Sequence, residues 1–242
     1  MATLYVVSTP IGNLEDLSFR ALRILKEVDL ILCEDTRVTK KLLNHYGIKT
    51  PTLSYHQHSK LQKIEYIINL LKDYNPPTTS SRLRRAPGKN LALVSDVGTP
   101  GISDPGNKLI KAIITSPGLV VKIVPIPGPS AVTAAASISG FPMDKFIFMG
   151  FPPTKRKRKK FFEEVLSSKY PVVFYESPHR ILKTLSELQS LVISHKSLVN
   201  VVVCRELTKK FETIYRGTIE EVLKQIEESE IKGEFVVIVG GK

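Results

Sequence analysis

The stretch Leu91–Gly106 reads LALVSDVGTPGISDPG, an apolar run that ends in a loop of small and acidic residues. Its first part, Leu91–Ser95, has the unbroken apolar character of a buried strand. Asp104 followed by Pro105 is typical of a helix N-cap and first helical residue. A loop between a strand and a helix lies at the carboxyl edge of an open α/β sheet, where such sheets bind ligands. Capping by Asp104 would explain part of this loop, but loops of this length are usually functional.

Two other segments repeat the order of strand, turn and helix. Ser8–Asp16 reads STPIGNLED and follows the apolar run Leu4–Ser8. It lacks the G-x-G-x-x-G spacing of a dinucleotide site, and a purely local need for Gly is the alternative explanation. Pro125–Ala131 reads PIPGPSA after the strand-like Val120–Val124. Tight helix–sheet packing is the first explanation of its small residues, and close approach of a ligand is the alternative.

Strand-like and helical patterns alternate along most of the chain. Further strands are expected at Leu30–Cys33, Phe146–Met149, Val172–Tyr175, Asn200–Cys204 and Phe235–Val239, with helices near Ser18–Glu27, Thr36–Tyr46 and Pro129–Gly140. This alternation predicts an α/β fold of two α/β domains with largely parallel sheets. A Pro-Gly turn within Ser116–Leu119 places the boundary between an N-terminal domain, residues 1–116, and a C-terminal domain, residues 119–242.

Individual residues also mark where helices begin and end. Gly47 follows an apolar helical pattern and is a plausible stop in the left-handed conformation. Thr218 and Glu221 have the spacing of a capping box, which predicts a helix beginning there.

Positive charge is concentrated in two segments of this 242-residue chain. Lys155–Lys160 reads KRKRKK, and Asn75–Lys89 adds Arg82, Arg84, Arg85 and Lys89 in a Pro/Ser/Thr-rich stretch expected to form a loop. Together they carry most of the +12 net charge, so the rest of the chain is nearly neutral. A solvated surface is the ordinary explanation of such runs. Attraction of phosphate is the functional one, and it favours a nucleic-acid partner.

Composition narrows the setting and the class of protein. No apolar run approaches the roughly 20 residues of a membrane span, and the first strand begins without a signal-peptide pattern. Cys33 and Cys204 lie in apolar runs, which predicts buried thiols and a cytoplasmic location. Neither a P-loop nor a G-x-S-x-G elbow is present. His56 and His58 share one strand face but have no ligand at a familiar spacing, so no metal is expected.

Charged residues cluster after three predicted strands. Cys33–Arg37 (CEDTR) holds Glu34, Asp35 and Arg37; Phe174–Arg180 (FYESPHR) holds Glu176, His179 and Arg180; Arg205–Glu212 (RELTKKFE) holds Arg205, Glu206, Lys209 and Glu212. Structural ion pairs are the commoner role of such residues. Three such clusters at strand ends nevertheless keep a functional role open beside the structural one.

These motifs, with GFPPTK at Gly150–Lys155, occur in the order and at the separations of a known family. The chain resembles the ribosomal RNA small subunit methyltransferase I family, which methylates a cytidine 2′-hydroxyl of 16S ribosomal RNA. That family belongs to the tetrapyrrole-methylase (class III) superfamily, which depends on S-adenosylmethionine. Where its members usually carry a Glu and an Asn, this chain has Gln57 and Ser59, and Asn75–Lys89 replaces a short turn.

The resemblance implies two α/β domains with S-adenosyl-L-methionine in the cleft between them, a homodimer, and 16S rRNA within the small ribosomal subunit as partner. The residues that it implies for cofactor binding are Pro10, Gly12, Asp96, Gly98, Thr99, Ile102, Ser103, Asp104, Ser130 and Ala131.

Methylation of a sugar hydroxyl needs precise positioning and a group that accepts the hydroxyl proton. The preferred catalytic candidates are Glu176 and Glu206, followed by Asp35 and His179. The candidates for contacts with RNA are Arg37, Lys155, Arg156, Lys157, Arg158, Arg180 and Arg205. Two alternatives remain at this point: a corrin or porphyrin precursor methyltransferase, and a non-catalytic RNA-binding assembly factor.

Overall fold

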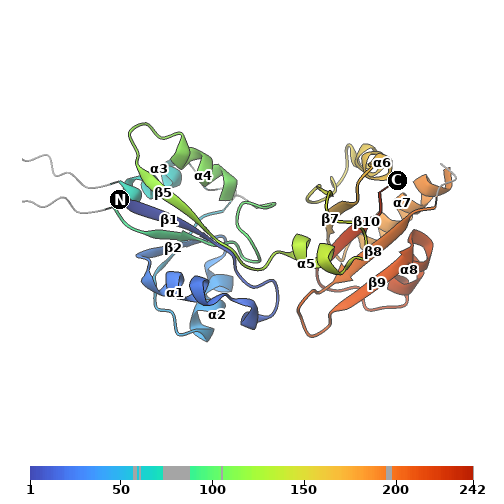
Figure 1. The fold of residues 1–242 in the computed structure, drawn as a ribbon, viewed down its shortest axis with the longest axis horizontal. Coiled ribbons are helices and arrows are strands. Elements are labelled where there is room, and N and C mark those ends of the chain that lie inside the picture. Colours follow the sequence, from blue (N-terminus) through green and yellow to red (C-terminus); the bar gives the residue numbers. More distant parts are fainter. Residues whose placement is uncertain (57–58, 60, 73–87, 105, 195–197, 242) are drawn as a thin grey trace, which may run out of the picture. The chain divides into compact units, whose positions relative to one another are not determined.

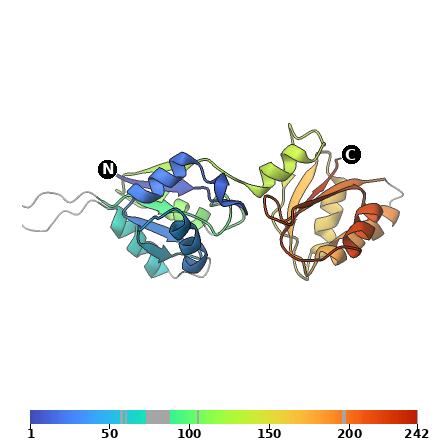
Figure 2. The same ribbon diagram turned by 90° about the horizontal axis from the view of Figure 1, so that it is seen from below.

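The computed structural model describes residues 1–56, 59, 61–72, 88–104, 106–194 and 198–241. The chain divides into two compact units, the first unit (Met1–Ser130) and the second unit (Ala131–Lys242). Each contains its own sheet and its own helices (Figures 1 and 2). The α/β class predicted from the alternating pattern is therefore confirmed.

A parallel sheet forms the centre of the first unit. Its strands are β1 (Ala2–Val7), β2 (Leu30–Cys33), β3 (Thr52–Ser54), β4 (Leu91–Leu93) and β5 (Val121–Ile126), in the spatial order β3-β2-β4-β1-β5. Every neighbouring pair in this sheet is parallel. The central β1 and β4 are almost wholly apolar because both of their faces are covered.

Helices cover both faces of this sheet. On one face lie α1 (Phe19–Glu27) and α2 (Thr36–His45), and on the other lie α3 (Leu61–Leu71) and α4 (Gly106–Ile114), as Figure 1 shows. The two cores use alternate residues of one strand: Ile31 packs with the α1 and α2 side, and Leu32 with the α3 and α4 side. A short 3₁₀ helix, η1 (Leu14–Asp16), precedes α1.

The predicted helix signals are confirmed in both units. Gly47 follows α2 with φ +62°, the left-handed conformation that only glycine adopts without strain. Thr218 and Glu221 form a reciprocal capping box at the start of α8 (Ile219–Glu227).

The second unit is built on a mostly antiparallel sheet, which corrects the prediction of largely parallel strands for this half. Its strands are β6 (Ile147–Phe148), β7 (Val172–Glu176), β8 (Asn200–Arg205), β9 (Thr213–Thr218) and β10 (Phe235–Val239), in the order β6-β7-β10-β8-β9. The β6–β7 pair is parallel, whereas β10 runs antiparallel to both of its neighbours and β8 and β9 form an antiparallel hairpin. The β–α–β connections exist as expected, but the last strand enters between β7 and β8 in the opposite direction.

Three helices pack on one face of this second sheet. They are α6 (Arg158–Ser167), α7 (Ile181–Ser194) and α8, and their apolar residues share one core cluster with the sheet. Within that cluster the rings of Phe161 and Phe162 lie 5.8 and 6.4 Å from the ring of Phe174. Helix α5 (Ala131–Ile138) contacts β7 and β10 and contributes no residue to that cluster, which places it on the other face.

The division between the units falls between Ser130 and Ala131, not in the predicted turn at Ser116–Leu119. The reason is β5, which pairs with β1 from Val121 to Ile126 and so completes the first sheet. The Pro-Gly turn therefore connects α4 to β5 within one unit.

Both cysteines, Cys33 and Cys204, are buried and unpaired with each other, as predicted. Across the ranges that the structure describes, no helix combines the length and the apolar character needed to cross a bilayer.

The aromatic cluster at the centre of the second unit yields a test of its core. Replacing Phe174, which is fully buried, with alanine (Phe174→Ala) is expected to lower the free energy of unfolding by about 3–5 kcal/mol, because a ring-sized cavity remains. Urea denaturation followed by circular dichroism measures the loss. The control Phe211→Ala removes a ring that is 64% exposed and should change stability by about 0.5 kcal/mol or less. Equal losses in both variants would contradict this assignment of the core.

Candidate functional site

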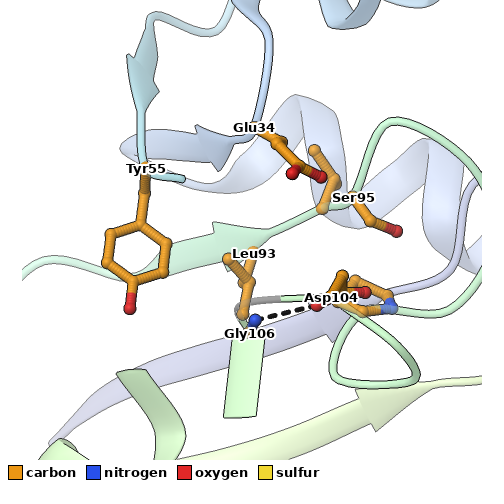
Figure 3. Close-up of a pocket in the computed structure, with 8 residues that line it drawn as sticks. Glu34, Tyr55, Leu93, Ser95, Asp104 and Gly106 are labelled. Atoms are coloured by element: carbon orange, nitrogen blue, oxygen red, sulfur yellow. Dashed lines mark hydrogen bonds between the residues drawn. The ribbon is translucent and has the colours of Figure 1, made fainter. Parts of the chain in front are cut away.

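The loop that follows β4 is closed by the side chain of Asp104. Its Oδ1 atom accepts hydrogen bonds from the backbone N–H groups of Gly101 at 2.7 Å and of Gly106 at 2.8 Å. Figure 3 shows the second of these bonds at the start of α4. Asp104 thus has the capping role expected of it, whereas Pro105 lies outside the described residues.

Hydrogen bonds join the turns that follow β1, β4 and β5. The Thr9 N–H donates to the Gly98 carbonyl at 2.9 Å, which links the first turn to the second. The Ser8 and Thr99 hydroxyls lie 2.9 Å apart, and Thr99 donates to the Pro129 carbonyl at 3.1 Å, which reaches the third turn. Three segments far apart in the sequence therefore meet at the carboxyl edge of the first sheet.

Glycine is required where these turns approach one another. Gly98 has φ +79°, and a Cβ atom there would lie 3.4 Å from Cγ2 of Ile11. A Cβ on Gly128 would come within 3.0 Å of the Ser8 Cβ. A side chain at Gly98 would be strained by the positive φ, and one at Gly128 would displace Ser8 by a few tenths of an ångström, so both positions favour glycine.

The remaining predicted cofactor residues are placed differently from one another. Pro10 is buried, whereas Gly12, Ile102 and Ser103 are exposed. Ser103 has φ +66°, an uncommon conformation for a residue with a side chain. Ser130 ends the first unit and Ala131 begins α5 in the second.

A small open hollow lies beside the loop after β4. It has a volume of about 190 Å³ including the space open to solvent. Its lining residues come from the ends of β2, β3 and β4 and from the loop before α4, and they are Glu34, Tyr55, Leu93, Val94, Ser95, Pro100, Asp104 and Gly106 (Figure 3). Tyr55 was not predicted as a site residue, and Glu34 was grouped with Asp35 without a role. Both residues directly follow a strand, and this position in the sequence could have indicated that they lie at the carboxyl edge of the sheet.

Carboxyl groups gather around this hollow. Burial raises the pKa of Glu34, and the nearby charges of Asp96 and Asp104 raise it further. Burial also raises the pKa of Asp96, whose Oδ1 atom accepts the backbone N–H of Asp35 at 2.9 Å. Perturbed carboxyl groups beside a hollow are typical of functional sites.

Asp35 faces a different environment although it is the neighbour of Glu34 in the sequence. Its carboxylate caps α2 and pairs with the Arg37 guanidinium at 2.7 Å. Hydrogen bonds from the side chain and backbone of Arg37 lower the pKa of Asp35 to about 2. At neutral pH so acidic a group is a weak proton acceptor.

Glu176 lies at the end of β7 and is buried in a network of hydrogen bonds. Its carboxylate accepts from the Ser177 N–H at 2.8 Å and the Thr184 hydroxyl at 2.6 Å. It pairs with Arg180 at 2.8 Å and, more distantly, with Arg158 at 3.8 Å. These contacts and its burial favour a structural role over the catalytic one predicted for it.

Arg158 does not belong to the exposed basic surface that the KRKRKK run predicted. It is 6% exposed. Its guanidinium donates to Glu187 at 2.6 Å, to Thr184 at 2.5 Å and to the Pro153 carbonyl at 3.1 Å. The exposed part of the run is therefore Lys155–Lys157, in a turn before α6, together with Lys159 and Lys160 on the helix.

The cluster after β8 is also tied into the fold. Arg205 is buried, and its Nε atom donates to the Lys232 carbonyl at 2.8 Å. Glu206 accepts from Lys209 at 2.8 Å and from the Glu234 N–H at 2.9 Å. Burial opposes ionisation of Glu206, but these hydrogen bonds prevail and lower its pKa. By contrast, His179, in the turn before α7, has an exposed side chain.

Part of the predicted site lies outside the described residues, namely Gln57, His58 and the stretch 73–87 with Arg82, Arg84 and Arg85. Among the residues that are described, no three His, Cys, Asp or Glu side chains are arranged to hold a metal ion.

Comparison with known proteins identifies the class of protein that has this fold. The family of Tetrapyrrole (Corrin/Porphyrin) Methylases matches residues 3–223. Two solved structures share the fold at 17% sequence identity. A cobalt precorrin-4 methyltransferase matches with a TM-score of 0.65 over 98% of this chain and 94% of its own. The uroporphyrin-III-C-methyltransferase of Thermus thermophilus matches with a TM-score of 0.62 over 99% of this chain and 94% of its own. The two units are thus those of a methyltransferase of the tetrapyrrole-methylase fold.

Closer relatives identify the branch. Three relatives are named Ribosomal RNA small subunit methyltransferase I. The one from Thermotoga maritima is 41% identical over all of both chains. The one from Halalkalibacterium halodurans is 45% identical over 99% of this chain and 76% of its own, and the one from Bacillus subtilis is 44% identical over 100% of this chain and 76% of its own. The chain belongs to the tetrapyrrole methylase family, within its ribosomal RNA small subunit methyltransferase I branch. The resemblance drawn from the motifs is confirmed.

The pairing of Asp35 with Arg37 yields a test by titration. In Arg37→Gln the pKa of Asp35 is expected to rise from about 2 part of the way toward 3.8, because the side-chain hydrogen bonds and the charge of Arg37 are lost while the backbone N–H of residue 37 still donates to the carboxylate. In the wild type the pair stabilises the folded state above pH 3.8, and this contribution fades as the pH falls toward 2. Carboxyl NMR measures the pKa, and Arg20→Gln is the control that should leave it unchanged. An unaltered pKa in Arg37→Gln would show that another group acidifies Asp35.

Proposed function

We propose that this chain methylates a cytidine 2′-hydroxyl in 16S ribosomal RNA, using S-adenosylmethionine, on the assembled small subunit. The observation that carries the proposal is the relationship to the Thermotoga maritima protein, which is named Ribosomal RNA small subunit methyltransferase I and is 41% identical over all of this sequence and all of that one. The corrin and porphyrin methyltransferases share the fold at only 17% identity. They therefore support the architecture and not a tetrapyrrole substrate.

The carboxyl edge of the first sheet suits the cofactor. Methyltransferases of this family use S-adenosylmethionine, which supplies an electrophilic methyl group when bound. Gly98 and Gly128 let backbone come close to a ligand at the junction of the turns. The residues proposed to hold the cofactor are those that the resemblance implies, namely Pro10, Gly12, Asp96, Gly98, Thr99, Ile102, Ser103, Asp104, Ser130 and Ala131.

Proton removal is the chemical task left to the protein. As the bond from the 2′-oxygen to the methyl carbon forms, the bond from that carbon to the donor sulfur breaks, S-adenosylhomocysteine is the leaving group, and the hydroxyl proton must pass to an acceptor. Glu34 suits this role because it borders the hollow and its raised pKa brings it closer to the operating pH. The accepted proton then returns to solvent.

The four catalytic candidates proposed from the sequence fit less well. Glu176 is buried and held by two arginines, and the pKa values of Glu206 and Asp35 are lowered. His179 is exposed and is the best remaining alternative to Glu34. We therefore rank Glu34 first and His179 second.

Binding of RNA is assigned to exposed cations. The basic turn Lys155–Lys157 is exposed and can reach phosphate groups. Arg37 pairs with Asp35, but its side chain is 88% exposed and can contact a phosphate as well. Arg180 is partly exposed but is paired with Glu176, and Arg158 and Arg205 are buried. The proposed RNA-binding surface is therefore smaller than the sequence run suggests.

A homodimer in the cytoplasm completes the proposal. Buried unpaired thiols at Cys33 and Cys204 are in keeping with a reducing compartment. Sedimentation of the purified chain tests the dimer, and mass-spectrometric mapping of 2′-O-methyl groups on small-subunit RNA, with and without the protein, tests the reaction. Methyl transfer to a porphyrin precursor but not to RNA would overturn the proposed substrate.

The assignment of the proton acceptor is tested by Glu34→Gln. This variant is expected to lower kcat about 10²-fold or more while KM for the subunit stays near the wild-type value, because the amide cannot accept the proton. The matched control Glu65→Gln changes an exposed carboxylate on α3 and should retain full activity. A normal rate in Glu34→Gln together with a loss in His179→Gln would transfer the role to His179.

The basic turn is tested by the salt dependence of RNA binding. Neutralising Lys155, Arg156 and Lys157 together by substitution with Gln should reduce the slope of log K against log salt by about 2–3, since each phosphate contact contributes about 0.7–0.9. The control replaces three exposed lysines of the first unit, Lys108, Lys111 and Lys122, with Gln. If both triple variants lower the slope equally, the turn has no special part in binding RNA.

A further inference from the structure

An aromatic surface lies beside the basic turn, and nothing in the proposed reaction has used it. The Tyr175 ring lies 5.0 Å from the Phe148 ring and 5.4 Å from the Phe151 ring, measured between centroids. Phe151 is 53% exposed, whereas Phe148 and Tyr175 are half-buried. The three rings form one partly open cluster, here called the aromatic surface.

This surface lies at the edge of the second sheet. β6 is the edge strand, paired on one side with β7, and the Tyr175 N–H continues the ladder by donating to the Gly150 carbonyl at 2.8 Å. The rings are separate from the Phe161, Phe162 and Phe174 cluster of the core, which is buried. Phe151 therefore does not contribute to the buried core, and packing in the core does not explain an aromatic residue at this position.

Two arginines fix the short segment between the aromatic surface and the basic turn. Arg180 donates to the Pro152 carbonyl, and Arg158 donates to the Pro153 carbonyl, both at 3.1 Å. Both guanidiniums also face the buried Glu176 carboxylate. Arg180 is held by Glu176 at 2.8 Å, and Arg158 by Glu187 at 2.6 Å. The two guanidiniums thus hold two consecutive carbonyls in place, and with them the spacing between Phe151 and Lys155.

The combination of rings and cations indicates a particular kind of ligand. Aromatic side chains with an open face stack on nucleobases, and adjacent cations contact the phosphates of the same strand. A surface that is already rigid before binding loses less entropy when it binds. A base in a duplex is stacked on both sides, so this surface suits an unpaired nucleotide.

We propose that Phe151 and Tyr175 stack against one unpaired base of the RNA substrate while Lys155–Lys157 contact its neighbouring phosphates. Arg158 and Arg180 act as positioning residues, because they hold the segment that joins the rings to the cations. This inference rests on the proposed function and adds how the RNA is presented, as an unpaired strand. The alternative occupant, a second copy of this chain packed against the exposed edge, is an outcome of the test.

The test uses the full chain and two RNA probes. One is a single-stranded oligonucleotide carrying 2-aminopurine, whose fluorescence falls on stacking, and the other is the same strand in a duplex. The wild type should quench the single strand and bind it more tightly than the duplex. Phe151→Leu should weaken binding to the single strand about 5- to 100-fold, as expected for the loss of one base–aromatic stack, with the quenching abolished.

Matched variants separate stacking from folding and from charge. Phe151→Tyr keeps a ring and should bind and quench as the wild type does. Phe19→Leu removes an aromatic ring that is 93% exposed in the first unit and should have no effect. The slope of binding against salt should stay unchanged in Phe151→Leu, because no cation is removed, and an unchanged circular dichroism spectrum shows that the variant is folded.

Several results would overturn the inference. One is that Phe151→Leu binds the single strand as tightly as the wild type does, and another is that it loses affinity for the single strand and the duplex equally. A third is that the wild type fails to bind the single strand. The fourth is that Phe151→Leu changes the protein from a dimer to a monomer. The last would identify the edge as a contact between two copies. Absence of methyl transfer by a wild type that still binds and quenches the single strand would overturn the proposed reaction and leave the stacking surface standing.

Discussion

Parallel pairing in the first sheet is the constraint on which the site depends. It sends the carboxyl ends of β1, β4 and β5 to the same edge, so the turns that follow them have to share a small volume. The contacts among Ser8, Thr99 and Pro129 bind these turns to one another, and Gly98 and Gly128 make room for them. A ligand at this edge therefore meets backbone groups whose positions are set by the sheet and not by flexible side chains.

A buried carboxylate plays the corresponding part in the second unit. Glu176 has no access to water, so its charge requires partners, and it obtains them from Arg158, Arg180, Ser177 and Thr184. Removing either arginine would leave the charge partly uncompensated. The same guanidiniums donate to the Pro152 and Pro153 carbonyls, which precede the basic turn. The arginines that compensate the buried charge therefore also hold this surface segment in place.

The sequence predicts well whatever depends on neighbours along the chain. The apolar runs, the capping box at Thr218 and the stop at Gly47 are local, and the structure agrees with each. The direction of β10 and the burial of Arg158 depend on partners far away in the sequence, and no local pattern reveals them. In the KRKRKK run, Arg158 looks like its neighbours because the acceptors that draw it inward lie on β7 and α7. Family resemblance supplied the class of reaction, which periodicity alone could not.

Glu34 and Asp35 show how adjacent residues acquire opposite chemistry. Glu34 is partly buried beside two other carboxyl groups, so its charged form is disfavoured, whereas Asp35 receives hydrogen bonds from Arg37 that favour its charged form. Environments that separate the pKa values of two carboxyl groups divide the work between them. Here Asp35 stays ionised at the start of α2 and keeps the end of β2 in place, with its N–H on Asp96. That arrangement leaves Glu34, whose pKa burial and the neighbouring carboxyl groups raise, as the one of the two that suits the proposed proton acceptor.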